Sequence, residues 1–267
     1  MASEPVPFID GHNDVLLALH LAGNGAAPFL ERRSEGHLDL ERAREGGLAA
    51  GFFAVFVLPE SEEERAATKI PDRKPPYAQP LPRPLPTEYA MREAAAIAEL
   101  LDELVTGGEV CVAQTTGDIE GALAGGPLAA ILHFEGAEPI TPGLDDLGEL
   151  YERGLRSLGL VWSRPNAFAE GVAFRFPSLP DTGAGLTEAG KRLVSECNRL
   201  GNPARPRTPE RARLLGRCGA VGGAARRQPL QRARAVGKLT QPDRRPARRD
   251  RRLGRHRRHH LPRRDAH

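Results

Sequence analysis

The 267-residue chain lacks the features of several common classes of protein. Its three cysteines, Cys111, Cys197 and Cys218, have no Cys-x-x-Cys spacing, so neither a disulfide framework nor a zinc ribbon is indicated. The first residues do not form a basic segment followed by an apolar one, so no signal peptide is predicted. No apolar run approaches the roughly 18 residues of a membrane-spanning helix. We therefore expect a soluble cytoplasmic protein that does not enter a membrane.

The composition of the chain changes after Gly201. Residues 1–201 contain every aromatic residue, every Ile and both Met, and carry 17 Lys+Arg against 31 Asp+Glu, a net charge of −14. Residues 202–267 contain none of those apolar types and carry 21 Lys+Arg, 20 of them Arg, against 4 Asp+Glu, a net charge of +17. Such a segment cannot bury enough apolar surface to offset its chain entropy. The composition predicts a folded part, 1–201, and a disordered Arg-rich tail, 202–267.

Apolar runs alternate with helical periods along residues 1–201. Runs typical of buried strands occupy 6–10, 48–58, 110–113, 128–134 and 155–162. Helices are expected over 88–106, 118–123, 144–152 and 188–200, with Thr87 and Thr187 as N-caps and Gly201 as a C′ residue. Seven prolines between Pro71 and Pro86 predict a long loop. The alternation predicts an α/β fold, either a doubly wound sheet or a (β/α)8 barrel.

The first expected strand leads into a His-x-Asp pattern. Positions i and i+2 of an extended segment point the same way, so His12 and Asp14 can present a nitrogen and a carboxylate oxygen to one cation. These ligand types suit a divalent metal such as zinc. Because the pattern is short, a His and an Asp in the turn after a strand explain it more simply when it is taken alone.

A carboxylate follows the apolar run 128–134. Glu135 lies at the end of that strand, where barrels carry their chemistry, and it can bridge two metal ions through its two oxygens. The alternative is a solvated glutamate at the start of a loop. Glu138 is a weaker candidate, and His133 is interpreted as a structural residue that points into a neighbouring layer.

Trp162 and Arg164 follow the run 155–162. An aromatic ring and a cation at a strand end can line a substrate pocket. A tryptophan packed over the rim of the fold explains the same pattern.

Together these pieces resemble the renal (membrane) dipeptidase family of zinc peptidases, particularly its bacterial members. The matching segments are FIDGHND at 8–14, LHFEGAEPI at 132–140, GLRSLGLVWSRPNAFAEGV at 154–172 and GLTEAGKRLVSECNRLG at 185–201. The resemblance implies a (β/α)8 TIM-type barrel with two zinc ions. In it, His12 and Asp14 would bind one zinc, and Glu135 would bridge both. A hydroxide between the metals would attack the peptide carbonyl of a dipeptide substrate.

The resemblance also implies differences in this chain. Trp162 replaces a histidine that contacts the substrate in the family. The family takes two further zinc-binding histidines, a substrate-binding arginine and an aspartate from later strands, and no residue after Gly201 matches them. The residues matched here supply about half of the eight strands of a closed barrel. We therefore expect an incomplete barrel that is inactive on dipeptides, and whether it forms a homodimer is left open.

A shifted reading frame is one hypothesis for the loss of resemblance. Out-of-frame GC-rich codons give mostly Arg, Pro, Ala and Gly, which is the composition of 202–267. Codons can be chosen for this segment so that the frame one base later spells DLAH and SHSNAH, which carry the two missing histidines. The first of these histidines falls across Thr208 and Pro209, and the second falls across Pro229 and Leu230.

A different class of function is nucleic-acid binding through residues 202–267. Arginines would bind phosphates with a strong dependence on salt. The segment has no aromatic residue to stack on bases, so no specific nucleic-acid partner is expected. His256, His259 and His260 have a spacing that suggests a metal site, but the neighbouring arginines would repel a cation.

Overall fold

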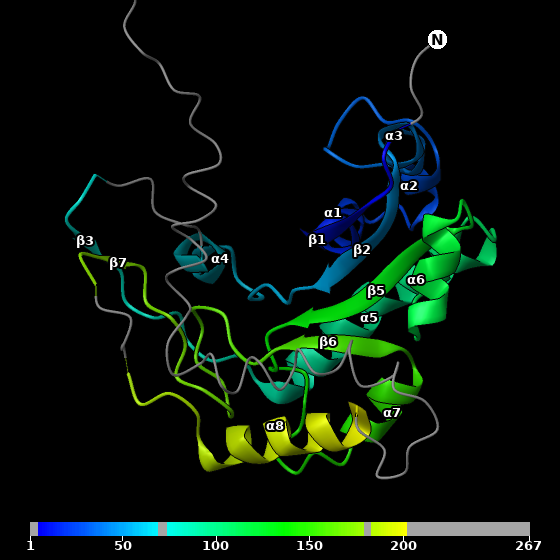
Figure 1. The fold of residues 1–267 in the computed structure, drawn as a ribbon. Helices are drawn as coiled ribbons and strands as arrows, with labels where there is room; N and C mark the ends of the chain where they lie inside the picture. Colours follow the sequence, from blue (N-terminus) through cyan, green and yellow to red (C-terminus); the bar gives the residue numbers. More distant parts are fainter. Residues whose placement is uncertain (1–4, 69–73, 179–182, 202–267) are drawn as a thin grey trace, which may run out of the picture. The chain divides into compact units, whose positions relative to one another are not determined.

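The computed structural model describes residues 5–68, 74–178 and 183–201 (Figure 1). The strands are Phe8–Asn13 (β1), Leu48–Val55 (β2), Tyr77–Ala78 (β3), Val110–Val112 (β4), Leu128–Glu135 (β5), Leu155–Gly159 (β6) and Arg175–Phe176 (β7). The helices are Val15–Ala22 (α1), Ala27–Leu30 (α2), Leu40–Gly46 (α3), Glu62–Thr68 (α4), Thr87–Thr106 (α5), Thr116–Leu123 (α6), Leu147–Glu152 (α7) and Glu188–Gly201 (α8). The disorder, nucleic-acid binding and metal binding predicted for 202–267 lie outside the described residues.

The central element is a parallel sheet of five strands. β5 pairs with β2 along one edge, and along its other edge it pairs with β4 through its first residues and with β6 through its last. β1, β2, β5 and β6 are therefore neighbours in chain order, whereas β4, which precedes β5 in the chain, pairs with the edge of β5 that faces away from β2. The expected α/β class with parallel strands is confirmed.

The first strand differs from its prediction as a buried strand. β1 pairs only with β2 among the described strands, so it forms an edge of the sheet. Phe8 and Ile9 are 48% and 45% exposed. The strand also extends to Asn13, which places His12 inside it.

The Pro-rich segment is not entirely a loop. β3 lies within it and pairs with β7 in a separate antiparallel ribbon. Tyr77 and Ala78 both have a backbone N–H, and prolines are tolerated beside a short edge strand. The prediction that this segment lacks regular structure was therefore wrong for these two residues.

The helix ends test the predicted caps. Thr187 accepts a hydrogen bond at Oγ1 from the Gly190 N–H (3.0 Å), which confirms it as the cap of α8. Thr87 is instead the first residue of α5, whose N-cap position is Pro86. Gly201 is the last residue of α8 and not the residue after it.

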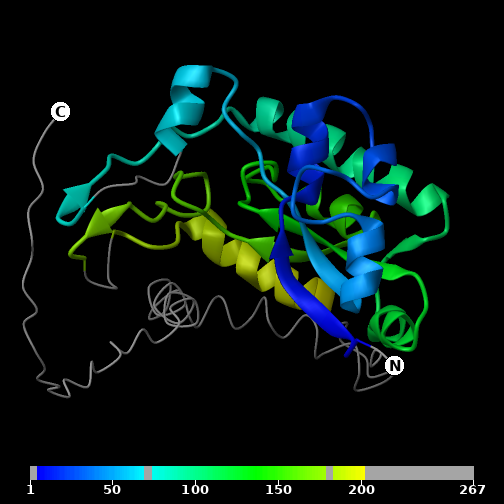
Figure 2. The same cartoon turned by 90° about the horizontal axis from the view of Figure 1, so that it is seen from above.

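Alternation along β5 divides the interior into two clusters. Leu128, Ala130, Leu132 and Phe134 belong to the larger cluster with apolar residues of α1 and α5, and Figure 2 shows α5 running along the sheet. Ala129 and Ile131 face the other way and pack in a smaller cluster with residues of α6. The face opposite α5 is therefore the one on which His133 and Glu135 lie.

Two further sequence expectations concern cysteines and membranes. Neither Cys111 nor Cys197 forms a disulfide bond within the described part of the chain. In the described part of the chain, no helix is both long and apolar enough to cross a bilayer.

Candidate metal centre

His12, Asp14 and Glu135 meet at the carboxyl ends of β1 and β5. His12 Nε2 lies 3.4 Å from Asp14 Oδ1 and 3.3 Å from Glu135 Oε2. One ligand atom from each of the three residues lies within 4.8 Å of the other two. All three side chains are partly exposed, so a cation can reach them from solvent.

Local structure explains why these side chains converge. His12 and Asp14 are two residues apart at the end of β1, and the chain turns directly into α1 after Asp14. β2 lies between β1 and β5, and Ala54 stands there in register with His133. Because Ala54 has only a methyl side chain, it leaves room for His12 and Glu135 to meet across β2.

The spacing of these atoms fits a bound divalent ion. Tetrahedral zinc holds nitrogen and oxygen ligands at about 2.0–2.2 Å, which separates two ligand atoms by roughly 3.3–3.6 Å. The two separations at His12 Nε2 fall in or next to this range. One imidazole nitrogen and two carboxylate oxygens are also a donor set that zinc accepts.

The two carboxylates surround His12 with negative charge. The side-chain hydrogen bond to Asp14, followed by that to Glu135, raises the pKa of His12 to about 10. The same hydrogen bond from His12 lowers the pKa of Asp14. In the metal-free protein the imidazole is therefore protonated at neutral pH, and a divalent cation would replace its proton.

His133 lies on the same face, two residues before Glu135. Its ring is 5.7 Å from that of His12, and its Nδ1 is 2.9 Å from Ser157 Oγ on β6. Burial, with a smaller contribution from the charge on His12, lowers the pKa of His133 to about 4. His133 is not part of the cluster of ligand atoms, and its bond to Ser157 links two strands behind that cluster.

Trp162 packs among other aromatic side chains. Its ring lies edge-to-face with Phe56 (5.1 Å between centroids) and with Phe174 (5.5 Å). These contacts fit the alternative in which Trp162 packs over the rim of the fold. A contact between Trp162 and the substrate stays a prediction.

Arg164 forms a buried link between loops. Its side chain is 1% exposed, and its Nη1 donates to the Val57 carbonyl at 3.0 Å and faces Glu138 Oε1 at 3.5 Å. Burial raises the pKa of Glu138, and the charge on Arg164 opposes that rise. Glu138 thus pairs with Arg164 and lies outside the ligand cluster. A substrate role for Arg164 stays a prediction, and the contacts of its side chain are structural.

Comparison with known protein families points to one family. The model of the membrane dipeptidases, peptidase family M19, matches residues 2–202. An uncharacterized protein in the PQQ-III 3′ region of Acinetobacter calcoaceticus is 36% identical over 201 residues, which are 74% of this chain and 62% of that protein. Human dipeptidase 3 is 27% identical over 198 residues, which are 73% of this chain and 35% of that protein.

Solved structures of related proteins share the fold of the described residues. Dipeptidase AC, a metallopeptidase of family M19, is 45% identical with a TM-score of 0.66 over 74% of this chain and 56% of its own. A metallopeptidase from Rhodobacter sphaeroides, liganded with a phosphinate mimic of the dipeptide L-Ala-D-Ala, is 41% identical with a TM-score of 0.68. That match covers 80% of this chain and 62% of the relative. The chain thus spans less than two thirds of the length of each of these relatives.

Proposed function

Since this chain belongs to the membrane dipeptidase family of metallopeptidases, we propose that residues 1–201 supply the zinc-binding half of a dipeptidase active site. In the complete enzyme that site would hydrolyse the peptide bond of a dipeptide. The observation that carries the proposal is that Glu135, which is far from His12 and Asp14 in sequence, converges with them at distances that fit one metal ion.

Each of the three residues has a distinct role in this proposal. His12 and Asp14 would hold one zinc ion, and Glu135 would offer a carboxylate oxygen to the same ion. Its second carboxylate oxygen is available to a second ion, because no described residue bonds it. When bound, zinc polarises the peptide carbonyl and lowers the pKa of a water molecule, which supplies the nucleophile.

We also propose that the sheet is the first half of a (β/α)8 barrel. β1, β2, β5 and β6 pair in chain order, as successive barrel strands do, and the three-residue β4 pairs beside the start of β5 outside that succession. The match to the family model covers residues 2–202, and the chain spans 56% and 62% of the two solved relatives. The family's ligands for a second zinc come from later strands. We therefore propose that the 267-residue chain binds one zinc ion and does not hydrolyse dipeptides.

A zinc titration tests the metal site. The wild-type chain should bind one zinc ion, and His12→Ala should weaken that binding by at least about 100-fold, because losing a direct ligand costs more than losing an outer partner. His20→Ala is the matched control, since His20 Nε2 pairs with the Glu93 carboxylate (3.4 Å) and, among the described residues, His20 belongs to no three-residue cluster of ligand atoms. Equal zinc affinity in the wild type and in His12→Ala would rule out the site.

Two further measurements test the proposal that the second half of the dipeptidase active site is absent from this chain. With zinc present, L-Ala-D-Ala should not be hydrolysed by the 267-residue chain, and zinc-dependent turnover would contradict the proposed inactivity.

The gene should spell DLAH one base out of frame near codon 208. Any other sequence there would eliminate the shifted frame as the origin of residues 202–267.

A further inference from the structure

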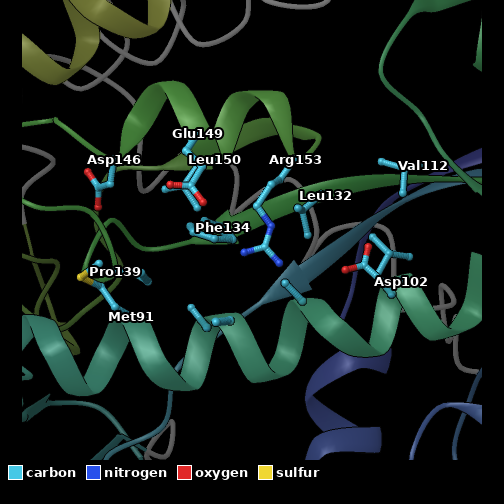
Figure 3. A pocket seen from close by; sticks show the side chains of 14 residues that line it. Met91, Asp102, Val112, Leu132, Phe134, Pro139, Asp146, Glu149, Leu150 and Arg153 are labelled. Carbon is cyan, nitrogen blue, oxygen red and sulfur yellow. The ribbon is translucent and has the colours of Figure 1, made fainter.

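A cavity of about 160 Å³ lies between α5, α7 and the sheet (Figure 3). Leu132 and Phe134 of β5 line it, whereas the next residues along the strand, His133 and Glu135, point to the metal face. Because side chains alternate along a strand, the cavity lies on the opposite side of the sheet from the metal centre. None of the three metal-site residues lines it.

We propose that this cavity binds a single free amino acid with an apolar side chain. Its apolar part is made by α5, β5 and α7, through Ala94, Ala98, Leu101, Leu132, Phe134 and Leu150. The alanines of α5 leave the space that larger side chains would fill. An apolar cavity of about 150 Å³ accepts a molecule of the size of benzene, whereas drug-sized ligands need roughly 300 Å³ or more. The volume therefore fits one leucine or phenylalanine side chain and is too small for a dipeptide.

Charged side chains of both signs stand at the cavity. Arg153 extends from the end of α7 towards α5, and Asp102 lies on α5 (Figure 3). Glu149 lies one turn before Arg153 on α7. In the described part of the chain, the side chains of these three residues have no hydrogen bond or ion pair. Asp146, also at the cavity, is already bonded to Thr141.

The charges at the cavity favour a ligand that carries both a carboxylate and an ammonium group. A guanidinium binds a carboxylate by charge-assisted hydrogen bonds, and the free carboxylates of Asp102 and Glu149 suit an ammonium group. An apolar site bordered by both charges is complementary to a zwitterion whose side chain enters the cavity. Hydrolysis of a dipeptide releases such molecules, and the cavity would bind them whether or not this chain hydrolyses dipeptides.

Calorimetric titration of the full chain with L-leucine and L-phenylalanine tests the proposal. At least one of them should bind, glycine should not, and Arg153→Gln should weaken binding by at least about 10-fold. Arg199→Gln is the control for loss of one exposed arginine, because Arg199 pairs with Glu196 on α8, and it should bind as the wild type does. His12→Ala should also bind as the wild type does, which separates this site from the metal centre.

Two more comparisons make the test decisive. Ala98→Phe should abolish binding by filling the cavity, and its far-UV circular dichroism should match the wild type. Because that variant can fail to fold, leucinamide and 4-methylpentanoate, which lack the carboxylate and the ammonium group respectively, provide the same test on the unaltered chain. Each should bind at least about 10-fold more weakly than leucine. Absence of leucine and phenylalanine binding, or equal binding of leucine and 4-methylpentanoate, would overturn the proposal.

Discussion

On β5, Leu132 and Phe134 are buried against the helices, whereas His133 and Glu135 on the other face are only partly buried and lie beside His12. One face stabilises the fold by removing apolar surface from water. The other holds polar groups in place for a cation. One strand thus separates stability from chemistry by the direction of its side chains alone, since a shift of one residue would exchange the two faces.

The largest expected effect is a loss of stability caused by a substitution on the apolar face of β5. Phe134→Ala should lower the free energy of unfolding by about 3–5 kcal/mol, because it removes a buried aromatic side chain next to an existing cavity. Urea denaturation measures the loss. Under conditions where the variant is folded, it should still bind one zinc ion. Glu135→Gln, its neighbour on the other face, should show the reverse: near-wild-type stability and weakened zinc binding.

The buried ion pair between Glu138 and Arg164, beyond the end of β5, tests whether charged residues can also stabilise the fold. Glu138→Leu should destabilise the protein by about 3 kcal/mol, because Arg164 would keep an uncompensated charge at 1% exposure. The double variant Glu138→Leu/Arg164→Met should recover more than half of that loss, since it leaves no buried charge. Unfolding curves of the two single variants and the double variant form the required cycle. If the double variant is no more stable than Glu138→Leu, the pair does not act as a unit.

The smallest expected effect is a dependence of stability on pH, which comes from His133 on the polar face of β5. The pKa of His133 is about 4 in the folded state, below the value of about 6.5 in an unfolded chain. Its neutral form therefore contributes stability that is complete above pH 6.5 and is lost as the pH falls from 6.5 to 4. We expect the metal-free protein to lose about 2 kcal/mol over this window on this account. The contribution of His12, whose pKa is raised, is complete below pH 6.5 and so does not reproduce this loss.

His133→Asn isolates this effect. In the presence of a chelator, the difference in unfolding free energy between wild type and variant should shrink as the pH falls from 6.5 to 4. A constant difference across the window would show that His133 does not keep its lowered pKa in solution.

Part of the secondary structure could be predicted from local pattern alone. Apolar runs located β2, β5 and β6, and the period of α5 identified that helix, because burial imposes a pattern on the residues themselves. The helix α1, VLLALHLA, was not predicted, since its residues are apolar on nearly every side and show no period. The two-residue strands β3 and β7 were missed because their pairing partner is about a hundred residues away.

The candidate metal ligands can be identified from the amino-acid sequence. His12 and Asp14 are two residues apart in an extended segment, and Glu135 ends an apolar strand, so local geometry already places each at a strand end. Packing of distant segments brings the three together, pairs Glu138 with Arg164 instead, and leaves a cavity behind β5. The physical reason is that the direction of a side chain follows from its neighbours in sequence. What it meets depends on the curvature of the sheet and on helices packed from distant parts of the chain.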